Sequence, residues 1–86
     1  MLLDEETIER LTRVQVRYID RLMALPHVIG VGIGFAQVGG QTTNQPSIVV
    51  MVDHKLPLAQ LAAEEVVPAE LDGVRVDVQA VGTFNA

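Results

Sequence analysis

A segment that is apolar on both faces of a strand sets the first limit on how this chain can fold. From Ser47 to Asp53, apolar side chains occupy both alternating sets of positions. They are Ile48, Val50 and Val52 on one face and Val49 and Met51 on the other. Such a strand is normally interior to a layered structure or covered by a neighbouring molecule, because a strand with one solvated face alternates with polar residues.

Glycine alternates with apolar residues in a second expected strand, from Val28 to Phe35. The apolar positions are Ile29, Val31, Ile33 and Phe35, with Gly30, Gly32 and Gly34 between them. A dinucleotide-binding loop needs its third glycine one position later, at a strand-to-helix turn, and Phe35 stands there. We therefore interpret the glycine face as a surface that another backbone or a helix approaches closely.

The remainder of the chain after this strand supplies connections and one more strand. Residues 36–46 are polar and predict a long hairpin loop, and Leu58 to Glu65 suits a short crossover helix. Leu71-Asp72-Gly73 predicts a tight turn. A half-exposed strand is expected from Val74 to Ala80.

The opening segment predicts a long amphipathic helix from Glu5 to Leu25, with Asp4 as its N-cap and Pro26 ending it. One apolar stripe predicts the core face: Ile8, Leu11, Val14, Tyr18, Ile19, Leu22 and Leu25. A second stripe is basic and consists of Arg10, Arg13, Arg17 and Arg21. It could recognise anions, but Glu6–Arg10 and Glu9–Arg13 pairs at i,i+4 favour a solvated, ion-paired face.

Together these elements predict one α+β domain over residues 1–86, in the order α-β-β-α-β. The long helix (4–25) packs on a β-β-α-β unit (28–82) with a small three-stranded mixed sheet and one short crossover helix. Strand order remains open from the sequence.

Composition excludes several function classes. The formal net charge is −5, which opposes binding to nucleic acid and anionic membranes. The absence of Cys excludes thiol nucleophiles, zinc ribbons and redox dithiols. The start of the chain lacks a signal-peptide pattern and no run of residues is long and apolar enough for a membrane span, so we expect a cytoplasmic protein, with an extracellular location left open.

No set of residues predicts catalysis, a cofactor or a metal. Ser47 lacks the Gly-x-Ser-x-Gly elbow of a strand-borne nucleophile. His27 and His54 are the only histidines and lack the spacing of a two-His site. Asp53 and His54 are adjacent in an extended segment, which directs their side chains to opposite faces. We expect a non-enzymatic protein without a cofactor.

Several motifs resemble a known family over about residues 26–82. They are the Val-Ile-Gly-Val-Gly-Ile-Gly run from Val28, the Pro-Ser-Ile-Val-Val-Met-Val run from Pro46, the Lys-Leu-Pro-Leu run from Lys55, and the Val-Pro-Ala-Glu-Leu-Asp-Gly-Val run from Val67 with the Asp-Val pair at Asp77. The pattern resembles the N-terminal segment found ahead of bacterial trypsin-like serine protease domains. The resemblance implies an accessory or propeptide-like module and carries over no catalytic residue, because the catalytic part has no counterpart here.

The sizes of the elements predict what this module does. Three strands make a sheet of about 14 by 23 Å, and the short helix covers at most about half of one face. On the order of 200 Å² of apolar sheet then stays uncovered, which predicts self-association as a structural subunit of a homo-oligomer, either a closed ring or dimer or an open filament. The candidate interface residues are Ile29, Val31, Ile33, Val49, Met51, Leu22 and Leu25. The alternative is an accessory domain that binds a trypsin-like protease through a sheet edge.

Overall fold

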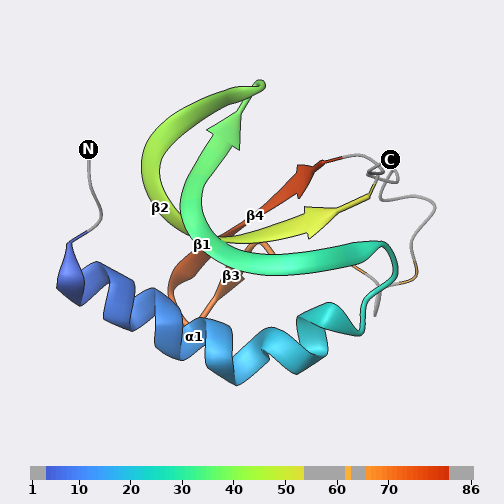
Figure 1. Ribbon diagram of the computed structural model, residues 1–86, viewed down its shortest axis with the longest axis horizontal. Coiled ribbons are helices and arrows are strands. Elements are labelled where there is room, and N and C mark those ends of the chain that lie inside the picture. Colours follow the sequence, from blue (N-terminus) through green and yellow to red (C-terminus); the bar gives the residue numbers. More distant parts are fainter. Residues whose placement is uncertain (1–3, 54–61, 63–65, 82–86) are drawn as a thin grey trace, which may run out of the picture.

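A computed structural model describes residues 4–53, 62 and 66–81. Its elements follow in the order α1 (Glu5–Met23), β1 (Val28–Val38), β2 (Gln41–Val52), β3 (Glu70–Leu71) and β4 (Val74–Ala80). The strands form one sheet with the spatial order β1-β2-β4-β3. The β2–β4 pair is parallel and the other two pairs are antiparallel, so the sheet is mixed. One face of the sheet rests on α1, and the long β1–β2 hairpin curls away from the helix (Figure 1).

The expected α+β class and the mixed sheet are confirmed, but the expected count of three strands is wrong. The fourth strand is β3, which has only two residues and pairs with β4 across the turn at Asp72-Gly73. So short a strand has no alternation that a sequence pattern could reveal. The expected crossover helix falls on residues 58–65, of which only Ala62 is described. In the described part of this connection, at 62 and 66–69, there is no helix.

The expected long loop over residues 36–46 is also wrong, because both strands continue through it. Val38 pairs with Gln41, which leaves a two-residue turn at Gly39 and Gly40. Both glycines have positive φ, 59° and 80°, as the tight hairpin turns that match strand twist require. Apart from Val38, the residues next to this turn are polar, and this outer part of the hairpin lies beyond the core.

The predicted N-cap of α1 is confirmed. The Asp4 carboxylate accepts a hydrogen bond from the Thr7 backbone N–H at 2.7 Å and so satisfies one of the unpaired amides of the first turn. The helix ends at Met23, two residues before the expected end. Pro26 disfavours helical backbone at Leu25, whose N–H bonds the Leu22 carbonyl in a tighter turn.

The core lies between α1 and the sheet face that it covers. Its buried members are Leu11, Val14, Leu22, Ile48, Val50, Val52, Val74 and Val76. A bulge between Val28 and Gly30 interrupts the alternation expected for β1. Val28 packs against the core, whereas Ile29 is 45% exposed, because a bulge adds an unpaired residue and redirects its side chain.

Candidate functional site

The side chains of α1 and the following turn that contact the core form one stripe, which we call the core stripe: Leu11, Val14, Tyr18, Leu22 and Leu25. The largest exposed apolar side chains of α1 lie on a face next to this stripe. Residues spaced three and four apart share a helix face, and here they are Ile8, Thr12, Val16, Ile19 and Met23. We call this set the outer face. Ile8 is 40% exposed, Val16 70% and Met23 43%. Ile8 and Ile19 were expected in the core, but Ile8 is exposed and Ile19 only half-buried.

The outer face amounts to on the order of 300 Å² of exposed apolar surface, which is in the range of the largest patch on a typical monomer and is often functional. Its polar borders carry Arg13 and Asp20, and neither side chain makes a hydrogen bond or ion pair with another described residue. The outer face is therefore an apolar strip with unpaired charges of both signs along its rim.

The edge of β1 beside the outer face is partly closed. Gln15 Nε2 donates to the Val31 carbonyl at 2.9 Å. Because β1 is an end strand of the sheet, this carbonyl belongs to the edge that an added strand would use. The Gln15 side chain occupies that acceptor, so strand addition at β1 is disfavoured and the neighbouring helix surface is the more accessible contact.

The sheet face opposite α1 carries less exposed apolar surface than the sequence predicts. Met51 leans over the glycines of β1, and a Cβ placed on Gly30 would lie only 2.9 Å from Met51 Cε. Val49 is 9% exposed. The Asp77 carboxylate accepts from the Gln37 backbone N–H at 2.9 Å and thereby holds the curled end of β1 against β4.

The expected interface residues are therefore distributed over different environments. Leu22 is 2% exposed and belongs to the core of the single chain. Leu25, Val31 and Ile33 are half-buried and pack against that core. Among the expected set, only Ile29 is well exposed. Val16 and Met23 are exposed apolar residues that the sequence interpretation missed, although their helical spacing from Ile8 and Ile19 was a usable signal.

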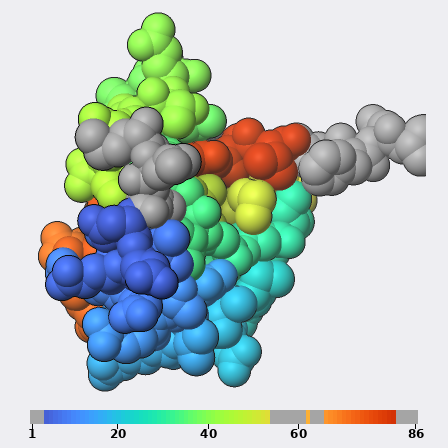
Figure 2. All heavy atoms as spheres, turned by 60° about the vertical axis from the view of Figure 1, so that its left-hand side comes forward, coloured from blue at the N-terminus to red at the C-terminus, as the bar shows by residue number. Residues whose placement is uncertain are grey.

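The basic stripe lies on the other side of α1, over the β3–β4 turn. Arg17 Nη1 is 3.2 Å from Asp72 Oδ2, and the Tyr18 hydroxyl donates to Asp72 Oδ1 at 2.9 Å. Arg10 Nη2 donates to the Gly73 carbonyl at 3.4 Å. Figure 2 shows the start of α1 (blue) beside this turn (orange).

The ion pairs expected for this stripe are wrong: among the described residues, neither Glu6–Arg10 nor Glu9–Arg13 forms a bridge. Arg10 and Arg17 instead hold the turn, and Arg13 and Arg21 make no bond to a described residue. Arg10, Arg13 and Arg17 line a shallow hollow with Val14 and Asp72.

The residues considered for catalysis have structural contacts. Ser47 is fully buried, and its hydroxyl donates to the Gln45 carbonyl at 3.2 Å. His27 Nδ1 lies 3.1 Å from Asp53 Oδ1, and His54 lies outside the described residues. Over the described ranges, no group of three or more His, Cys, Asp or Glu side chains could hold a metal ion, and no helix is both long and apolar enough to cross a membrane.

Comparison with protein families corrects the expected resemblance. Residues 7–81 match the family described as the NARROW LEAF 1 N-terminal domain, a plant-type family, and not the N-terminal segment of bacterial trypsin-like proteases. The match does not support the protease-associated or the filament interpretation, and both are wrong. No curated protein matches the chain. Since the match covers most of its length, the chain belongs to the NARROW LEAF 1 N-terminal domain family.

Proposed function

We propose that this domain functions as a non-enzymatic self-association module that pairs two copies through the outer face of α1. The observation that carries the proposal is Val16, which is 70% exposed and lies midway along the length of this face. An exposed Val on a helix does not stabilise the single domain, because Val is a weak helix former and its apolar side chain stays in water. Burial against a second copy would stabilise it.

The charges on the rim favour a two-fold, antiparallel arrangement of the two helices. With the axis between Gln15 and Val16, the Ile8 side chain of one copy faces Met23 of the other. Arg13 then lies within about two residues of Asp20 of the second copy along the helix, so the two rim charges form symmetric ion pairs across the interface. A parallel arrangement would instead place Arg13 beside Arg13 and Asp20 beside Asp20.

The size of the outer face predicts weak association. Burial of on the order of 600 Å² over two copies, at about 25 cal/mol per Å², gives a gross gain of about 15 kcal/mol. Loss of translational and rotational freedom opposes this by about 4–15 kcal/mol, before any ordering of side chains. Within this range, and after the further cost of ordering side chains, we expect a net gain of about 4–7 kcal/mol, which corresponds to a dissociation constant between about 10 µM and 1 mM.

Sedimentation equilibrium of the full 86-residue chain tests the proposal. We expect the weight-average mass to rise from one copy towards two between about 10 µM and 1 mM protein. A mass that stays at one copy over this range would refute self-association. A mass that rises past two copies without a plateau would refute the closed two-fold arrangement.

A further inference from the structure

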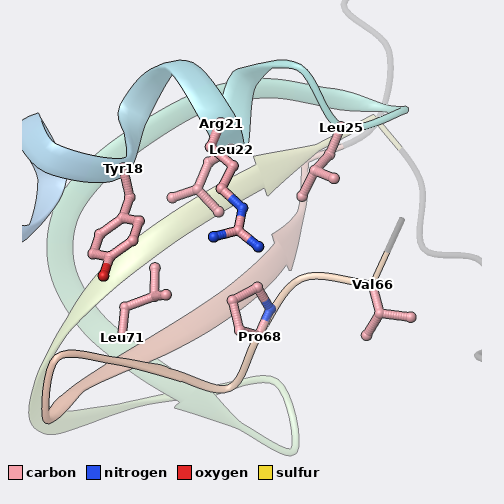
Figure 3. A pocket seen from close by; sticks show the side chains of 7 residues that line it. All are labelled: Tyr18, Arg21, Leu22, Leu25, Val66, Pro68 and Leu71. Atoms are coloured by element: carbon pink, nitrogen blue, oxygen red, sulfur yellow. The ribbon is translucent and has the colours of Figure 1, made fainter. Parts of the chain in front are cut away.

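A second surface of α1 combines an apolar pocket with an unpaired cation. The pocket has a volume of about 80 Å³ and lies between α1 with the turn after it, β3, and the segment before β3. Its lining residues are Tyr18, Arg21, Leu22, Leu25, Val66, Pro68 and Leu71. Figure 3 shows the Arg21 guanidinium directed toward Pro68, into the space that these side chains surround.

From this arrangement we propose that the pocket binds an acidic peptide segment of a partner protein by one aliphatic side chain, with a neighbouring carboxylate on Arg21. The pocket is small and mostly apolar, which suits a single Val- or Leu-sized side chain. Arg21 makes no hydrogen bond or ion pair to a described residue, so its planar fork of donors is open to a carboxylate.

The rest of the basic stripe extends this site along the helix. The hollow lined by Arg10, Arg13 and Arg17 adjoins Tyr18 and already neutralises one acid, Asp72. Arg13 remains unpaired there and is eight residues from Arg21, about 12 Å along the helix axis. An extended peptide covers this distance in about four residues. The partner segment therefore carries an aliphatic residue, an adjacent acid and a second acid four positions further on.

The pocket and Arg21 lie apart from the outer face, which is on the opposite flank of the core stripe, and only Arg13 belongs to both proposed contacts. At 100° per residue, the directions of Arg21 and Val16 differ by about 140° around the helix axis. Occupation of the outer face by a second copy therefore leaves the pocket and Arg21 accessible and competes with the peptide only at Arg13.

Fluorescence anisotropy with a dye-labelled Gly-Leu-Glu-Ser-Ser-Ser-Glu-Gly peptide tests the proposal. We expect saturable binding by the full chain that weakens as salt is raised. Arg21→Gln should weaken binding about tenfold, since a charge-assisted contact is lost. Arg75→Gln removes the same charge from β4, outside this pocket, and should leave binding unchanged.

Two further probes locate the site. A peptide with Ser in place of Leu and a peptide with Gln in place of both Glu should each bind at least about tenfold more weakly. Val16→Lys should bind the original peptide as well as the unaltered chain does, which separates this site from the outer face. Absence of saturable binding up to about 5 mM peptide would overturn the proposal, because an affinity weaker than this is negligible. The proposal would also be overturned if Arg21→Gln bound the original peptide as tightly as the unaltered chain does, or if the Ser-substituted peptide bound as tightly as the original peptide.

Discussion

Replacement of Val16 by Lys should abolish self-association while leaving the fold intact. Val16 is 70% exposed, so the change creates no cavity, and Lys is a better helix former than Val. Each copy loses about 100 Å² of apolar contact, which over two copies corresponds to at most about 5 kcal/mol at 25 cal/mol per Å². Allowing for partial retention by the Lys stem, we expect a loss of about 2–5 kcal/mol, or a dissociation constant weakened about 30- to 4,000-fold.

Lys is chosen because it lowers the magnitude of the net charge of −5, so weaker association cannot arise from greater overall repulsion. Val38→Lys is the matched control, since Val38 is 58% exposed and adjoins the Gly39–Gly40 turn. This end of the β1–β2 hairpin curls away from α1 (Figure 1). Sedimentation equilibrium gives the dissociation constants, and circular dichroism gives the unfolding midpoints. The reasoning is refuted if Val16→Lys and Val38→Lys associate as the unaltered chain does, or if Val38→Lys weakens association as much as Val16→Lys.

Three further predictions concern the fold. Asp77→Ala should lower the free energy of unfolding by about 1–3 kcal/mol in urea titrations, because the Gln37 backbone N–H loses its acceptor and the Gln79 side-chain amide keeps only the Phe35 carbonyl; an unchanged midpoint would show that this carboxylate does not hold the hairpin. Leu22→Ala should lower the free energy of unfolding by about 2–5 kcal/mol in the same titrations, because Leu22 is 2% exposed in the core. A decrease of less than about 1 kcal/mol would contradict the placement of Leu22 in the core. Hydrogen bonds with Thr7, from its side chain first and its backbone N–H second, lower the pKa of Asp4 from 3.8. The stabilisation by Asp4 is therefore present above this value and is lost as pH falls through the lowered pKa. Thermal melts of Asp4→Ala and the unaltered chain should converge in acid, and a constant difference at all pH values would argue against this origin.

The elements that could be predicted from the sequence are those fixed by local chemistry. The N-cap at Asp4 and the strand over Val74–Ala80 depend on residues next to each other in the chain. The outer part of the β1–β2 hairpin could not be predicted in this way, because its polar strand residues carry no apolar alternation. Strand β3 exists because its two residues pair with β4, and the two residues alone carry no pattern that predicts a strand.

The candidate site was only partly predictable for a similar reason. The sequence indicated unburied apolar surface, but assigned it to the sheet. Met51 lies over the glycines of β1 instead, and the exposed surface lies on α1 at Val16 and Met23. Which of two adjacent helix stripes faces the sheet depends on the docking angle of α1, a long-range property that the period of 3.6 residues does not determine. The bulge that exposes Ile29 is likewise a feature of strand pairing.

Because the chain contains no cysteine, a single introduced thiol reports directly on the two-fold contact of α1. Val16→Cys should form a disulfide-linked dimer under mild oxidation at protein concentrations where association occurs, since the proposed axis passes beside this position. Val38→Cys, exposed to a similar degree, should stay monomeric under the same conditions. Equal dimer yields from the two variants, or no dimer from Val16→Cys, would contradict the pairing of two copies through the outer face.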